Sequence, residues 1–153
     1  MKQLMVIGTT LVAGLLLSTG VQAGDVEDII ALEKGHYLAR NNGDLDTWVQ
    51  YHLPERDGFG PGGDLLSGGT SAEEEKRGLK AQLDAGMKYN HRLVHVDVKV
   101  FGDTAITTGY VVGSSTSPDG KTNRAMMRRT GVVLKRNGQW KELHNHLSPV
   151  VTP

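Results

Sequence analysis

The second half of the chain alternates between apolar and polar residues, which is the period of a half-buried β-strand. In HRLVHVDVKV (residues 91–100), valine occupies every second position from Val94 to Val100. Three more segments have strand composition and lie between turn-forming residues; they are AITTGYVVG (105–113), NRAMMRRTGVVLK (123–135) and QWKELHNHLSPV (139–150). The pattern predicts four consecutive strands joined by turns.

The first half of the chain has helical periodicity instead. Apolar residues three and four positions apart predict a first helix from Asp25 to Asn41, with Asp25 as its N-cap and Gly43 just beyond its end. The apolar stripe of this helix contains Val26, Ile29, Ile30 and Tyr37, and also Glu33. Helices followed by strands are typical of an α+β fold.

Two further helices are expected before the strands. Asp44 caps a short second helix in LDTWVQYHL (45–53), which Pro54 ends. Residues 55–69 are glycine-rich and irregular, apart from a short strand at 64–66. Thr70 and Glu73 have the spacing of a capping box and open the third helix.

The N-terminus is interpreted as a secretory signal peptide, residues 1–23. Lys2 precedes an apolar run, and Val21-Gln22-Ala23 places small residues where signal peptidase requires them. The apolar run is shorter than the ~20 residues of a spanning helix, although an uncleaved anchor is the alternative. Residues 24–153 then form one domain, periplasmic or secreted, without a stable membrane anchor after processing.

The charge and cysteine content of the chain limit the kinds of partner and of stabilising bond that it can have. The chain has 17 basic and 17 acidic residues and no basic cluster, which argues against nucleic acid as a partner. It has no cysteine, so stability must come from packing without disulfides, with a partner subunit as a further source. No sequence pattern indicates that the protein binds a cofactor.

The order of three landmarks is typical of a known superfamily. They are NNGDLDTW (41–48), VFGDTA (100–105) and RRTGVVLKRNGQWKELHNHLS (128–148). The chain resembles the nuclear transport factor 2-like superfamily, within it the SnoaL-like group, and is similar to the association domain of calcium/calmodulin-dependent protein kinase II. The resemblance implies a curved antiparallel sheet wrapped around N-terminal helices, a cone-shaped α+β barrel with a pocket inside. It also implies a homodimer through the outer sheet face, and it does not fix a function.

The first strand pair has a clear expected register. If Gly102-Asp103 is a two-residue turn, Val100 pairs with Ala105 and Val98 with Thr107. Continued without a break, this register pairs Val96 with Gly109 and Val94 with Val111. These residues form an apolar face that suits packing against helices, and His95 lies on the opposite face.

The last hairpin, around Asn137-Gly138, allows two registers. A two-residue loop pairs Arg136 with Gln139, whereas a three-residue loop pairs Lys135 with Gln139 and gives a bulge. The resemblance favours the three-residue loop. The residues then facing the helices are Met127, Arg129, Gly131, Val133, Lys141, Leu143, Asn145 and Leu147, and those facing outward include Trp140, Glu142, His144 and His146.

The histidines fall into two groups. His144 and His146 are expected on the outer face under a second subunit; a metal site with His95 and acid–base catalysis are the alternatives. The remaining three, His36, His52 and His91, are expected to be exposed to solvent.

Five residues are candidates for the pocket. Tyr37 and Trp48 would contact a ligand from the helices, and Arg129 and Asn145 would oppose each other across the last hairpin. Glu33 lies on an apolar stripe, where desolvation would raise its pKa toward that of a general acid or base, or it pairs with Arg129. A buried Arg129 needs an acceptor, from a side chain or from a ligand.

Two functions remain open. One is an exported module for binding a small ligand or for assembly. The alternative is a cofactor-independent lyase, isomerase or cyclase, in which Glu33 moves a proton while Arg129 and Asn145 stabilise a developing oxyanion. Whether the protein is an enzyme is not decided by the sequence.

Overall fold

The computed structural model describes residues 23–63 and 71–151. The predicted signal peptide and the short strand at 64–66 fall outside these residues, apart from Ala23. None of the described helices is long and apolar enough to cross a membrane.

The described residues contain the helices α1 (Ala23–Asn41), α2 (Leu45–Gln50) and α3 (Ala72–Asp84). The Asp44 side chain accepts a hydrogen bond from the Thr47 amide and caps α2, as expected. The capping box of α3 lies one residue later than predicted, because Ser71 is the N-cap and its partner is Glu74.

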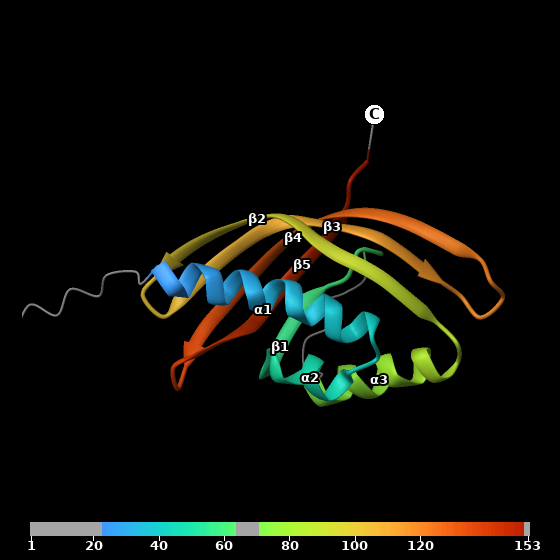
Figure 1. The fold of residues 1–153 in the computed structure, drawn as a ribbon, viewed down its shortest axis with the longest axis horizontal. Coiled ribbons are helices and arrows are strands. Elements are labelled where there is room, and N and C mark those ends of the chain that lie inside the picture. The colour runs from blue at the N-terminus through green and yellow to red at the C-terminus, as the bar shows by residue number, and fades with distance from the viewer. Residues whose placement is uncertain (1–22, 64–70, 152–153) are drawn as a thin grey trace, which may run out of the picture.

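The sheet contains β1 (His52–Phe59), β2 (Lys88–Phe101), β3 (Thr104–Thr116), β4 (Thr122–Arg136) and β5 (Gln139–Pro149) in the order β1-β5-β4-β3-β2. Figure 1 shows that this sheet is curved, that α1 crosses its concave face and that α2 and α3 lie beside β1. The four antiparallel strands β2 to β5 and the α+β class are as predicted.

The strand β1 corrects the prediction of an irregular segment after α2. It pairs in parallel with β5 and forms one edge of the sheet. Pro54 is compatible with this place, because an edge strand leaves some of its N–H positions without a ladder partner. Pro54 and Gly58 are unfavourable in strands, so the sequence pattern did not predict this one. The second helix ends at Gln50 instead of reaching Leu53.

The β2–β3 register is correct only near the turn. Val100 pairs with Ala105 and Val98 with Thr107, but the register shifts between Val94 and Asp97. His95, with φ of 52°, lies in this irregularity. Beyond it Leu93 pairs with Val111, so Leu93 is buried on the inner face in place of Val94.

The favoured register of the last hairpin is wrong near its turn. Arg136 pairs with Gln139, and Asn137 and Gly138 have φ of 52° and 77°, as in the two-residue turns that match strand twist. Trp140 and Glu142 therefore face the helices and are buried.

A β-bulge further along β5 reverses which residues face the helices, so the residues after it face as predicted. The register shifts between Val132 and Val133 and leaves Leu143 as the extra residue. Asn145 and Leu147 consequently face inward, and His144 and His146 face outward, as predicted. The expected pairing of Arg129 with Asn145 is wrong, because Asn145 pairs with Gly131 and Arg129 with Leu147.

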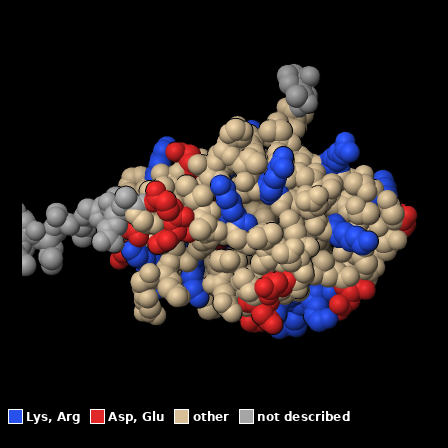
Figure 2. All heavy atoms as spheres, in the orientation of Figure 1, with Lys and Arg blue, Asp and Glu red and all other residues tan. Residues whose placement is uncertain are grey.

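Charged side chains of both signs are interspersed over α3, at the lower right of Figure 2. Lys80 Nζ lies 2.7 Å from Asp84 Oδ2 on this helix, and Lys76 Nζ lies 2.5 Å from Asp46 Oδ1 of α2. The second contact ties α3 to α2 on the side away from the sheet.

Candidate functional site

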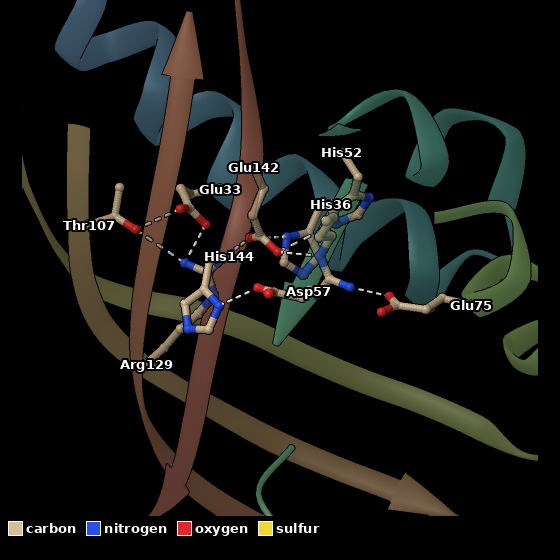
Figure 3. A network of polar contacts seen from close by, with 10 residues as sticks. Glu33, His36, His52, Asp57, Glu75, Thr107, Arg129, Glu142 and His144 are labelled. Atoms are coloured by element: carbon tan, nitrogen blue, oxygen red, sulfur yellow. Dashed lines mark hydrogen bonds and ion pairs between the residues drawn. The ribbon is translucent and has the colours of Figure 1, made fainter. Parts of the chain in front are cut away.

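The centre of the site is Glu142 of β5, which is fully buried. Arg56 Nε of β1 donates to Glu142 Oε1 at 2.7 Å, and Arg129 of β4 donates to Oε2. Burial alone would raise the pKa of this carboxyl, but Arg129 and Arg56 outweigh it and hold the pKa well below its usual range. Glu142 is therefore a carboxylate at neutral pH, fixed by two guanidinium groups (Figure 3).

Arg129 connects Glu142 to Glu33 of α1. Its Nη1 lies 2.5 Å from Glu33 Oε2, and Thr107 Oγ1 donates to Glu33 Oε1 at 2.6 Å. The predicted pairing of Glu33 with Arg129 is confirmed. Burial raises the pKa of Glu33, opposed by the charge of Arg129. Glu33 is fully buried behind Arg129, and its acid–base role stays a prediction.

Gly131 of β4 makes room for this contact. A Cβ at this position would lie 2.6 Å from Thr107 Oγ1, 2.8 Å from Arg129 Nη1 and 2.9 Å from Glu33 Oε1. All three atoms belong to side chains held by one another, so they cannot move apart freely. Gly131 is needed for its small size at this point of the strand.

Arg56 extends the network to α3, because its Nη1 contacts Glu75 Oε2. The chain of contacts therefore runs from Glu33 through Arg129, Glu142 and Arg56 to Glu75 (Figure 3). Sequence reasoning missed Arg56, Glu75 and Glu142. Glu142 was assigned to the wrong face by the register, and nothing in the alternation of β1 distinguishes Arg56 as a buried residue.

His36 and His52 lie against the same carboxylate, and the prediction that they are exposed is wrong. They are 4% and 3% exposed, and His91 is 6% exposed. Burial lowers the pKa of His52 to about 4 and puts that of His36 well below its usual range. Both rings are therefore neutral at pH 7. The spacing of His36, three residues after Glu33 on the buried stripe of α1, is the signal that could have identified it.

These two histidines and Glu142 have the composition of a metal site, with donor atoms within 4.8 Å of one another. The fit to a cation is nevertheless poor. Both Glu142 oxygens already accept hydrogen bonds from guanidinium groups, and a divalent ion placed among them would be repelled by two positive charges. The arrangement suits an ion-pair network better than a metal centre.

A cavity of about 420 Å³ opens above the network, between α1, α3, β1 and the end of β5. Its walls contain His36, Tyr37, Arg40, Trp48, Arg56, Gly58, Phe59, Gly60, Glu75, Gly78, Leu79, Gln82, Asn145 and Leu147. Three of the predicted ligand residues, Tyr37, Trp48 and Asn145, are among them. Arg129 and Glu33 are not, and Nη1 and Nη2 of Arg129 are directed to Glu33, Thr107 and Glu142 below the cavity.

Three polar atoms of residues in the cavity wall are buried and unpaired. His36 Nδ1, Tyr37 Oη and Arg40 Nε have no hydrogen-bond partner among the described residues. The His36 ring stacks on Tyr37 with centroids 4.0 Å apart, and its Nδ1 is 3.9 Å from Glu142 Oε2, beyond hydrogen-bond range. Burial raises the pKa of Tyr37 to about 12, so its phenol stays protonated and can donate.

A larger hollow of about 680 Å³ lies on the other side of α1, against α2 and the β4–β5 turn. Half of its lining residues are exposed side chains such as Asp28, Gln50 and Gln139, and it contains no member of the buried network. The smaller cavity is therefore the better candidate, because perturbed ionisable groups and unsatisfied polar atoms converge there.

The outer-face histidines contact β1 and β3 instead of one another. His144 Nδ1 lies 2.5 Å from Asp57 Oδ1, and the His146 ring lies 5.4 Å from that of Phe59. His95 lies beside Tyr110, with ring centroids 6.4 Å apart. Within the described residues the search for three-ligand clusters returns the buried set at Glu142 and none containing these histidines.

Comparison with known proteins gives the family. The SnoaL-like domain family matches residues 29–152. Comparison with curated protein sequences found no match.

Solved structures of similar fold have low sequence identity to this chain. A putative dehydratase of the nuclear transport factor 2-like family from Streptomyces avermitilis has a TM-score of 0.72 and 23% identity, covering 86% of this chain and 100% of its own. A putative calcium/calmodulin-dependent protein kinase II association domain from Xanthomonas campestris has a TM-score of 0.65 and 19% identity, covering 97% and 100%.

A ketosteroid isomerase-like protein from Erwinia carotovora atroseptica has a TM-score of 0.68 and 17% identity, covering 86% of this chain and 100% of its own. At these identities the likeness shows the fold alone. The curved sheet with helices on its concave face, together with the match over residues 29–152, places the chain in the SnoaL-like domain family.

Proposed function

We propose that this SnoaL-like domain binds a small molecule in the 420 Å³ cavity above Glu142. The observation that supports the proposal is the set of unsatisfied polar atoms on residues that line the cavity, His36 Nδ1, Tyr37 Oη and Arg40 Nε. Buried polar groups are nearly always hydrogen-bonded, because an unpaired one keeps its full desolvation cost. A ligand with a carbonyl, hydroxyl or carboxylate group would satisfy them.

The rest of the cavity suits a ligand with an apolar body. Trp48, Phe59, Leu79 and Leu147 contribute apolar surface, and Asn145 adds an amide at the β5 side. The ion-pair network below keeps the floor of the cavity fixed. A volume of this size is typical of small-molecule sites, and the wall combines these apolar side chains with polar and charged ones such as Arg40, Gln82 and Asn145.

Filling the cavity should abolish ligand retention. In a Leu147→Trp variant the indole would occupy the cavity, whereas Leu38→Trp places the same side chain on α1 at a position that is 62% exposed. We expect native mass spectrometry of the protein purified from its own host to detect a bound small molecule with wild type and Leu38→Trp, and none with Leu147→Trp. Equal retention by both variants would place the ligand elsewhere.

We further propose that the domain is exported and forms a homodimer through the outer sheet face. Several large apolar side chains are exposed on the strands there; they are Phe101, Ile106, Tyr110 and Met126. Large apolar side chains exposed on one face are typical of interaction sites. The dimer interface would also cover His144 and His146.

A charge at the centre of this face should separate the subunits. We expect Ile106→Asp to elute as a monomer in size-exclusion chromatography with light scattering, while wild type and Leu38→Asp elute as dimers. Ile106 is 40% exposed, so the change leaves the core intact. A wild-type protein that is monomeric at micromolar concentration would refute the proposed interface.

A second candidate function is cofactor-independent lyase or isomerase chemistry. It is favoured by the neutral His36, which can accept a proton at the cavity, next to the Tyr37 phenol, which can donate to a developing oxyanion. Two structural neighbours are named for a dehydratase and for a ketosteroid isomerase-like protein. Chemical conversion of the retained compound would favour this function over binding alone.

A further inference from the structure

We infer that the ligand of this cavity is a small monocarboxylate with an apolar body, whose carboxylate pairs with Arg40. The inference rests on the proposed binding function and adds the charge and class of the ligand. It is carried by the position of Arg40, in the last turn of α1 and in the cavity wall.

Arg40 is held in place by neutral groups. Its Nη2 donates to His91 Nδ1 at 2.7 Å, and its guanidinium carbon lies 5.3 Å from the ring centroid of Tyr37 and 4.8 Å from that of Tyr89. Burial and the charge of Arg40 lower the pKa of His91 to about 4, so the ring is a neutral acceptor at pH 7. These contacts fix the orientation of the guanidinium without neutralising it.

Arg40, which is partly buried, differs from the buried Arg56 and Arg129 in having no carboxylate partner among the described residues. Arg56 contacts Glu75 and Glu142, and Arg129 contacts Glu33 and Glu142. Within the described part of the chain, no carboxylate lies within ion-pair distance of Arg40, and its Nε is buried without a hydrogen-bond partner. The negative end of the α1 dipole offsets part of its charge, but it leaves this donor unsatisfied.

Arg40 is partly buried. A cation removed in part from water without a counter-charge is unfavourable, and guanidinium donors match a carboxylate in geometry. Arg40, Tyr37 and His36 all line the cavity, so one anionic group near α1 can satisfy more than one of them. A single negative charge is sufficient, because Arg56 is already paired with two carboxylates. Trp48, Phe59 and Leu147 would contact the apolar body.

The test uses benzoate, its neutral isostere benzamide, and inorganic phosphate as probes. Binding is measured on the purified full domain by ¹H–¹⁵N NMR titration, following the backbone amides and the Nε–H signal of Arg40. The variants are Arg40→Met and Arg40→Lys. The matched control is Arg136→Met, which removes a guanidinium that is 49% exposed and paired with Glu55 at the surface.

We expect wild type and Arg136→Met to bind benzoate about tenfold or more tightly than benzamide, as an ion-paired hydrogen bond requires, and to bind phosphate more weakly than benzoate. Benzoate should shift the Arg40 Nε–H signal. Arg40→Met should lose the preference for benzoate, and Arg40→Lys should keep part of it. If Arg40→Met does not fold, the Nε–H shift and Arg40→Lys decide the question.

Results that contradict the carboxylate inference differ from results that contradict ligand binding in the cavity. Equal affinity of wild type for benzoate and benzamide, or an unchanged preference in Arg40→Met, would overturn the carboxylate inference while leaving cavity binding in place. Phosphate binding as tight as benzoate would indicate a general anion site and would also overturn it. Absence of any shift at the cavity residues with all three probes would count against both proposals.

Discussion

Replacing Glu142 by glutamine should lower the free energy of unfolding by about 3–5 kcal/mol, the cost of breaking a buried ion pair by removing one partner. Glutamine keeps the size of the side chain and removes its charge. Arg56 Nε and Arg129 Nη2 would then face a neutral amide in a site with no access to water. Urea unfolding followed by circular dichroism measures the difference.

The matched control is Glu55→Gln, at the other kind of ion pair in this protein. Glu55 Oε1 lies 2.5 Å from Arg136 Nη1, but both side chains are about half exposed, at 47% and 49%. Exposed pairs of this kind contribute roughly 0–1 kcal/mol. If the two variants unfold at the same urea concentration, Glu142 is not the centre of the buried network.

The second large effect is loss of stability as the pH falls from 7 to 4. The folded-state pKa of His52 is lowered by burial from 6.5 to about 4, so between these values the unfolded chain binds a proton that the folded chain does not. The stabilising contribution is complete above pH 6.5 and is lost as the pH falls toward 4. It amounts to about 3 kcal/mol for this residue.

Three neighbouring ionisable residues modify this dependence of stability on pH. The lowered pKa of His36 acts in the same direction and over the same range below pH 6.5. The pKa of Glu142 is also lowered, so its contribution is lost below about pH 4.5, as protonation of the unfolded carboxyl begins. The raised pKa of Glu33 acts in the opposite direction, because acid relieves the cost of burying its charge.

The measurement is the free energy of unfolding in urea at several pH values between 7 and 4. His52→Phe keeps an aromatic ring beside Trp48, whose ring centroid is 4.2 Å from that of His52, and should flatten the profile by about 3 kcal/mol. His146→Phe is the control on the exposed outer face. A His52→Phe profile parallel to that of wild type would show that His52 does not titrate on unfolding.

The sequence predicted most of the architecture because the elements repeat a simple period. The stripe of α1, the Asp44 cap of α2 and the valines of β2 near its turn are local patterns that the structure confirms, and the capping box of α3 lies one residue from its predicted place. The residues that define the candidate site are different. Glu142 faces the core because β5 begins in one register and changes it at Leu143, and alternation alone cannot locate a bulge.

Local sequence patterns also failed to predict the buried charged and polar residues. His36, Arg56 and Glu142 are polar residues that hydrophobic periodicity assigns to the surface. Arg56 of β1 and Glu142 of β5 are buried as an ion pair, and the His36 ring of α1 is buried against the same carboxylate. Contacts of this kind join segments that are distant in sequence, so they can be recognised only once the fold is known. Glu33 was the exception, because Ile29, Ile30 and Tyr37 flank it on one helix.

The missing Cβ of Gly131 has an evolutionary consequence. A relative with alanine at this position would need a shorter side chain at 33, 107 or 129 to make space for the methyl group. Because residues in contact tend to vary together, these four positions should change as a set across the family, with glycine accompanying the glutamate–arginine pair and larger residues accompanying its loss.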